Sequence, residues 1–133
     1  MKDLEYCEKY GFDYIDIQSE CLNRDLEAGK ITLEEMGEWF KNHHLKMLSY
    51  NALCFFNMKQ TQEEKDAVMA ELDEIIRRCN ILGCKMIVVV PSKDMKERGL
   101  TPTRKEIRED EVAVLKEMVK KCEPHGIRLS LEF

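Results

Sequence analysis

Cys79-Asn-Ile-Leu-Gly-Cys-Lys-Met-Ile-Val-Val-Val-Pro91 is a junction between a helix and a strand. An apolar stripe at helical spacing precedes it, and Gly83 supplies the left-handed residue that commonly ends a helix. Residues 86–91 form an uninterrupted apolar run rich in β-branched side chains, which is typical of a strand covered on both faces in a parallel sheet. The junction therefore predicts an α/β fold.

The same junction recurs along the chain. Cys7-x-x-x-Gly11 and Cys122-x-x-x-Gly126 repeat the spacing of Cys79-x-x-x-Gly83, and Phe40-x-x-x-His44 is a fourth copy in which histidine must take the strained left-handed conformation. The junctions are 33, 39 and 43 residues apart, which indicates tandem βα units. We interpret residues 1–133 as one half-barrel domain, a partial (β/α)8 TIM barrel with about four parallel strands alternating with four helices.

Local patterns place the other elements. Helices are predicted over residues 2–10 and from the capping boxes Thr32-Leu-Glu-Glu35 and Thr61-Gln-Glu-Glu64. Strands are predicted over residues 14–18, 46–51 and 128–133, with residues 19–31 as a polar loop that has room for one helical turn and residues 52–56 as an apolar loop. A last helix from about residue 106 is expected to bury Ile107, Val112, Leu115, Val119 and Cys122.

Composition narrows the classes of function. The net charge is −5, so no basic field is available to bind nucleic acid, and no apolar run approaches the roughly 20 residues that cross a bilayer. The first residues lack an apolar signal region. We expect a soluble cytoplasmic protein with no nucleic-acid or membrane partner, and its six cysteines, none in a C-x-x-C pair, are expected to be reduced thiols.

Polar side chains mark one face of the first and last predicted strands. Arg128, Ser130 and Glu132 share a face, and a carboxylate at the C-terminal tip of a strand is where α/β enzymes hold their chemistry. Asp16 and Gln18 are predicted to lie inside the barrel. Counting from the repeated glycine would place residue 17 there instead, but an unpaired Asp16 between strand and helix would be costly. A structural salt bridge from Asp16 to an interior cation such as Arg128 ranks above a catalytic role.

Two further candidates follow from position. Asn51 precedes the apolar Leu53, Phe55 and Phe56, an arrangement typical of a small-ligand wall, although a loop-capping asparagine is equally consistent. The neighbouring histidines at 43 and 44 diverge by about 100° on a helix and are not expected to chelate one metal ion.

Four stretches carry a resemblance to a known family. Residues 7–17, 42–57, 88–91 and 129–133 resemble the sugar phosphate isomerase/epimerase family of xylose isomerase-like barrels, most strongly its branch in myo-inositol catabolism. The resemblance implies a chain that runs from the family's first helix to its fifth strand. It also implies an isomerase or epimerase that transfers a proton between adjacent carbons of a sugar or polyol. No catalytic base is assigned.

The family resemblance also implies a divalent metal, zinc or manganese, held at the tips of the fifth to eighth strands. Glu132 matches the first ligand, while the other three, an aspartate, a histidine and a glutamate, have no counterpart here, so the site is expected to be incomplete. Asn51, Gln18 and Asp16 are the substrate-binding candidates, although related isomerases tend to have arginine where Gln18 stands. Two alternatives stay open: an inactive half barrel that forms homo-oligomers through its open sheet edges, and, less favoured, a relative of abasic-site endonucleases.

Overall fold

The computed structural model describes residues 1–132, in which helices and parallel strands alternate. One 3₁₀ turn, Glu123–His125, precedes the last strand. The strands are β1 (Tyr14–Gln18), β2 (Lys46–Cys54), β3 (Met86–Val90) and β4 (Arg128–Leu131). The helices are α1 (Lys2–Lys9), α2 (Ser19–Glu27), α3 (Leu33–Asn42), α4 (Gln62–Leu82) and α5 (Arg104–Cys122).

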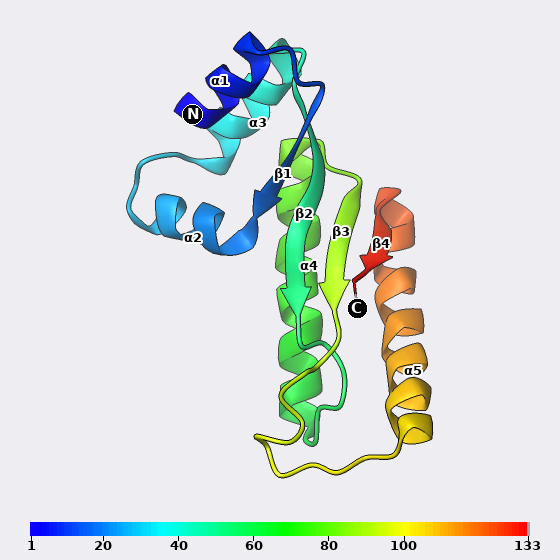
Figure 1. Cartoon of the computed structure of the whole chain (residues 1–133). Helices are drawn as coiled ribbons and strands as arrows, with labels where there is room; N and C mark the ends of the chain where they lie inside the picture. Colours follow the sequence, from blue (N-terminus) through cyan, green and yellow to red (C-terminus); the bar gives the residue numbers. More distant parts are fainter. Residues whose placement is uncertain (133) are drawn as a thin grey trace.

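The four strands form one sheet in the order β1-β2-β3-β4, and every neighbouring pair is parallel. All four therefore end at the same edge of the sheet, with α4 lying against β2 and β3 and α5 beside β4 (Figure 1). On the side that the helices cover, Tyr50, Ile87 and Val89 are buried in the core. Within residues 1–132 no further strand pairs with the outer edges of β1 and β4.

Three of the four repeated junctions have the predicted geometry. Their glycines lie in the left-handed region, and the amide after each glycine donates to the carbonyl of the preceding cysteine, which satisfies a free helix-end acceptor. These bonds are Phe12 to Cys7 at 3.0 Å, Cys84 to Cys79 at 2.9 Å and Ile127 to Cys122 at 3.3 Å.

The fourth junction ends differently, and the strain expected at His44 is wrong. His43, the residue that ends α3, is extended with φ −120° and ψ 161°. The left-handed non-glycine residues in the described part of the chain are Phe55 and Met58. The ammonium group of Lys46 donates instead to the carbonyls of Phe40 and, at 2.6 Å, of His43. The Lys46 side chain thus satisfies free carbonyls at the end of α3, as the amide after the glycine does at the other three junctions.

Three local expectations are corrected. Residues 19–27 form α2, a helix with one buried residue, Leu22, rather than a loop. Strand β2 continues through Cys54 instead of ending at residue 51. Helix α5 begins at Arg104 and buries Met118 and Cys122. The prediction is confirmed for Cys122, whereas the other four predicted core residues are partly or largely exposed, Val112 by 43% and Val119 by 40%. None of the described helices combines the length and apolarity that a membrane span requires.

Candidate functional site

Two of the predicted substrate-binding residues lie side by side at the carboxyl end of the sheet. The register pairs Gln18 with Asn51, Asn51 with Val88, and Val88 with Ser130, so one row crosses all four strands. Because Asn51 lies within β2 rather than in a loop, the loop-capping interpretation is wrong. The row leaves two side-chain amides adjacent to each other on the face opposite the helices.

Glu132 follows Ser130, the β4 member of this row, by two residues. Its amide donates to the carbonyl of Val89 at 3.0 Å, which continues the β3–β4 ladder, and its side chain is exposed. Alternation places Glu132 on the same face as Ser130. Strands β1 and β4 are three strand spacings apart, about 14 Å along the sheet. Glu132 therefore lies on the same face and at the same carboxyl end of the sheet as Gln18, but the two side chains are not in contact.

Asp16 occupies the position that polarity predicted. Ile15 and Ile17 are half-buried on the helix side, while Asp16 is exposed on the opposite face. The register shifts between residues 15 and 16 and pairs Asp16 with Ser49, whose hydroxyl donates to Asp16 Oδ1 at 2.5 Å. The expected salt bridge to an interior cation such as Arg128 is wrong: among residues 1–132 no cation lies within 4.0 Å of the Asp16 carboxylate, and Arg128 is on the opposite outer strand.

The apolar segment after Asn51 is mostly core. Leu53 and Phe56 are fully buried, and Phe55 is left 42% exposed with a left-handed backbone. Its amide donates to the carbonyl of Val90 at 2.7 Å. This bond holds the start of the β2–α4 loop against the end of β3.

Two buried polar residues also join the β2–α4 loop to the segment that follows β3. Ser92 N donates to Asn57 Oδ1 at 2.7 Å, and Ser92 Oγ donates to the Asn57 carbonyl at 2.6 Å. Asn57 is fully buried and Ser92 is 4% exposed. Hydrogen bonds in such a buried setting fix geometry strongly, because breaking one leaves a desolvated group unpaired. The loops after β2 and β3 therefore form one fixed rim.

The carboxyl end of the sheet also carries residues that sequence reasoning missed. Cys54 is exposed, and burial of its surroundings raises the pKa of its thiol, with the nearby carboxylates of Glu71, Glu20 and Glu132 adding to the rise and Lys93 opposing it. Simple alternation could not have found Cys54, because the register shifts between Asn51 and Leu53 and reverses the faces of the residues that follow. Three carboxylates and one lysine, from four different parts of the chain, therefore lie close enough to Cys54 to affect its thiol.

The residues present do not make a complete metal site. Within residues 1–132 no group of three or more His, Cys, Asp or Glu side chains is placed to hold a metal ion. His43 stacks on Trp39 with ring centroids 3.9 Å apart, and His44 Nε2 lies 2.5 Å from Asp13 Oδ1, so the two histidines have separate partners. All six cysteines are free thiols. Glu132 stands alone as a metal-ligand candidate.

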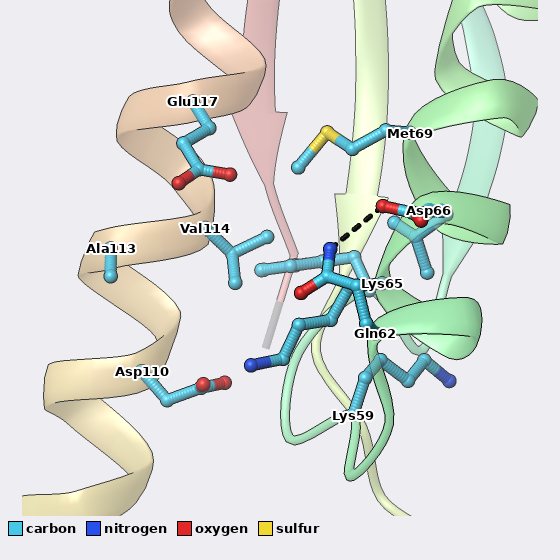
Figure 2. Close-up of a pocket in the computed structure, with 11 residues that line it drawn as sticks. Lys59, Gln62, Lys65, Asp66, Met69, Asp110, Ala113, Val114 and Glu117 are labelled. Atoms are coloured by element: carbon cyan, nitrogen blue, oxygen red, sulfur yellow. Dashed lines mark hydrogen bonds between the residues drawn. The ribbon is translucent and has the colours of Figure 1, made fainter.

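A groove of about 260 Å³ lies between α4 and α5, outside the sheet (Figure 2). Gln62 Nε2 donates to Asp66 Oδ1 at 2.8 Å on its α4 side. Asp110 and Glu117 line its α5 side. Because these side chains come from helix surfaces rather than from strand ends, the groove is separate from the row of Gln18 and Asn51.

Comparison with known proteins agrees with this architecture. The sequence profile of the xylose isomerase-like TIM barrel family matches residues 4–133. The chain belongs to this family. The fold is therefore part of a TIM barrel, as the repeated junctions predicted.

Two curated relatives of this xylose isomerase-like chain are named inosose isomerase. The one from Bacillus velezensis is 35% identical over 133 residues, which cover 99% of this chain and 45% of the relative. The one from Bacillus subtilis is 36% identical over 143 residues, covering 98% of this chain and 45% of the relative. The chain thus spans about half the length of the curated relatives it matches.

Solved structures extend the likeness to three dimensions. The structure of the IolI protein with a binding zinc atom has a TM-score of 0.84 and 34% identity, covering 99% of this chain and 45% of that one. D-psicose 3-epimerase from Clostridium cellulolyticum H10 has a TM-score of 0.71 at 15% identity, covering 98% and 45%, a likeness of fold alone. For this member of the family, the strand ends at the carboxyl edge of the sheet are accordingly the candidate site.

Proposed function

We propose that this chain supplies the first half of a barrel isomerase or epimerase that acts on an uncharged sugar or polyol, such as an inosose. The observation that carries the proposal is the row of Gln18 and Asn51 beneath Glu132 at the carboxyl end of the sheet. The names of its relatives favour an inosose. The carboxylates of Glu71, Glu20 and Glu132 near Cys54 favour a neutral polyol over a phosphorylated sugar, because carboxylates repel a phosphate group.

Each candidate residue has a role that its chemistry allows. The amides of Gln18 and Asn51 each offer two donors and an acceptor, which suits the hydroxyl groups of a polyol. Asp16, oriented by Ser49, accepts a hydrogen bond from a further hydroxyl. Phe55 gives the rim an apolar surface for the carbon skeleton. These contacts would hold two adjacent carbons in place for proton transfer, the step in which a positioned acid or base lowers the barrier.

Glu132 is proposed as one ligand of a divalent metal ion whose other ligands come from outside this chain. The zinc atom in the IolI structure favours zinc, and manganese is the second candidate. A catalytic zinc site needs about three protein ligands. We propose accordingly that the chain alone is inactive and that activity requires the rest of the barrel.

The test is complementation. The chain would be produced together with the parts of the Bacillus subtilis inosose isomerase that lie on both sides of the region it matches, and isomerisation of an inosose would be measured. We expect activity from the mixture and none from any piece alone. Mutation of a residue that only supports a metal ligand typically lowers metal affinity or activity about 10–100-fold. Glu132 is proposed as a ligand itself, so Glu132→Gln is expected to reduce activity by at least about 100-fold.

The matched control is Glu109→Gln, an exposed carboxylate of α5 that lies 3.8 Å from Lys105 and is not part of a strand. This change is expected to leave activity unaltered. Complemented activity that is equally insensitive to Glu132→Gln would refute the ligand role.

A second candidate is an inactive half barrel that forms homo-oligomers through its sheet edges. The unpaired outer edges of β1 and β4 in the described chain favour it, since exposed strand edges readily pair with another chain. A cytoplasmic location fits either candidate, because exposed thiols such as Cys21 and Cys54 persist in reducing compartments. The net charge of −5 gives no support to an abasic-site endonuclease.

A further inference from the structure

The loop between β2 and α4 contains two residues whose backbone conformation is unfavourable for them. Phe55 and Met58 both have a φ of 57°, in the left-handed region that favours glycine. A residue with a large side chain persists in this region only where its surroundings hold it there. The loop follows β2, which is paired with a strand on either side, so it does not lie at an outer edge of the sheet. Its conformation therefore needs support from other parts of the chain.

Hydrogen bonds from distant parts of the chain supply that support. The Phe55 amide donates to the carbonyl of Val90 at 2.7 Å. The Met58 amide donates to Asp110 Oδ2 at 2.6 Å, and Asp110 belongs to α5, 52 residues further along the chain. Tertiary contact rather than local preference thus sets the conformation of both left-handed residues.

Asn57, which lies between the two left-handed residues, is the buried centre of the loop. Its side-chain oxygen accepts from the Ser92 amide, and its backbone carbonyl accepts from the Ser92 hydroxyl. Asn57 is fully buried, and within residues 1–132 its Nδ2 has no hydrogen-bond partner. A buried amide that is half unpaired carries a desolvation cost that an apolar side chain would avoid. Asn57 therefore contributes through the position that its two oxygen atoms fix.

The loop held in this way leaves one aromatic ring exposed at the carboxyl end of the sheet. Phe56 and Asn57 are fully buried, whereas the Phe55 side chain is 42% exposed. Phe55 follows Asn51, a substrate-binding candidate, by four residues. The electron-rich face of an aromatic ring suits the C–H groups of a polyol, whose hydroxyl groups a side-chain amide can bond.

We propose that Asn57 is a positioning residue: with Ser92 it holds Phe55 at the rim, so that the aromatic ring packs on the C–H face of the polyol substrate. This inference deepens the isomerase proposal and rests on it. Asn57 itself touches no substrate, because it is fully buried. The ring makes the same contact with the bound substrate and with the transition state, so its loss raises KM and leaves kcat nearly unchanged.

The first test measures hydrogen exchange of backbone amides in the 133-residue chain alone. Asn57→Ala is expected to speed exchange of the Phe55 amide by at least about 10-fold, because local opening becomes easier. Ser92→Ala removes one of the two bonds to Asn57 and is expected to have a smaller effect in the same direction. Circular dichroism establishes that each variant folds, and Ser92→Ala decides the matter if Asn57→Ala does not fold.

The matched control is Asn80→Ala, which removes the same side chain from an exposed position whose hydrogen bond is to His125. It is expected to leave exchange of the Phe55 amide unchanged. Exchange of that amide at the same rate in the folded loop variants as in the unmodified chain would overturn the positioning role.

The second test is a double-mutant cycle in the complementation mixture, with KM for the inosose as the readout. Phe55→Ala and Asn57→Ala are each expected to raise KM about 10-fold with little change in kcat, since each removes one aromatic contact. The double variant is expected to match Phe55→Ala alone, because Asn57 acts through a ring that is no longer there. A merely structural role would lower the active fraction, and hence kcat, in both backgrounds. Effects on KM that multiply in the double variant would overturn the inference.

The two tests separate this inference from the isomerase proposal. An inactive mixture containing the unmodified chain would refute the isomerase proposal and, with it, the substrate contact of Phe55, while hydrogen exchange still judges whether Asn57 holds the loop. An active mixture whose KM is insensitive to Phe55→Ala would overturn the present inference alone.

Discussion

At the scale of single residues, Arg78 joins three elements of the fold. Its Nη1 donates to Asn23 Oδ1 of α2 at 2.5 Å and to Tyr50 Oη of β2 at 3.1 Å, while its Nε donates to Glu74 Oε1 at 2.8 Å. Tyr50 is 1% exposed, and its burial raises the pKa of the phenol. The guanidinium can serve three acceptors because its donors are fixed in a planar fork.

Glu74 makes this cluster sensitive to acid. Hydrogen bonds from Arg77 and Arg78 lower the pKa of Glu74 from 4.5 to about 2. A carboxyl group whose pKa is lowered by folding stabilises the fold above its ordinary pKa, and that stabilisation is lost as the pH falls through the folded value. We expect the free energy of unfolding to decline between pH 4.5 and about 2.

The measurement is urea denaturation at a series of pH values for the unmodified chain and for Glu74→Gln. The variant is expected to be less stable at neutral pH and to show a shallower decline in this range. Some decline remains, because capping bonds also lower the pKa values of Glu64 and Glu106. Parallel profiles for the two proteins would contradict the assignment to Glu74.

At the scale of elements, α3 and α4 approach closely at Gly37. A Cβ atom built there would lie 2.5 Å from the carbonyl oxygen of Ile81, which belongs to the backbone of α4 and cannot rotate away. Replacing glycine by alanine within a helix normally stabilises it by about 1 kcal/mol. Here the clash reverses the sign, because overpacking typically costs about 1–3 kcal/mol.

Gly37→Ala is therefore expected to destabilise the chain by about 1 kcal/mol, the middle of the difference of about 0–2 kcal/mol between these two effects. Denaturant unfolding measures the change. Lys41→Ala, at a side chain that is 72% exposed on the same helix, is the control and is expected to shift stability by less than about 0.5 kcal/mol. A stabilised Gly37→Ala would mean that the helices cross with more room than this contact allows.

Elements with strong local signals could be predicted from the sequence, and those without them could not. The boxes at Thr32 and Thr61 form as predicted, with Glu35 and Glu64 reaching back to the cap amides, because all the partners lie within four residues. Helix α2 was missed since its first cap, Gln18, makes no side-chain capping bond and one residue alone is buried. Tertiary contact rather than local preference makes it helical.

At the scale of the whole molecule, some side chains that the apolar spacing predicts to be buried are exposed in residues 1–132. The apolar spacing predicted Val112 and Val119 as core, yet both lie on the edge of α5 that no described element covers. Polarity alone placed Asp16, Gln18 and Glu132 on one face, since alternation fixes the face of a strand. A metal-binding role for Glu132 came from the family resemblance, because one carboxylate does not specify a metal site.

That shortage of ligands leads to a prediction about metal binding. No cluster of three ligand residues exists in residues 1–132, and a catalytic zinc site needs about three. We expect titration of the chain with zinc to show no tight stoichiometric site and a chelator to leave its thermal unfolding midpoint unchanged. Exposed thiols could bind zinc weakly, so the titration is repeated with Cys21→Ser and Cys54→Ser. Stoichiometric zinc binding that survives these changes and disappears in Glu132→Gln would contradict the prediction, since it would mean that this half of the barrel assembles a metal site by itself.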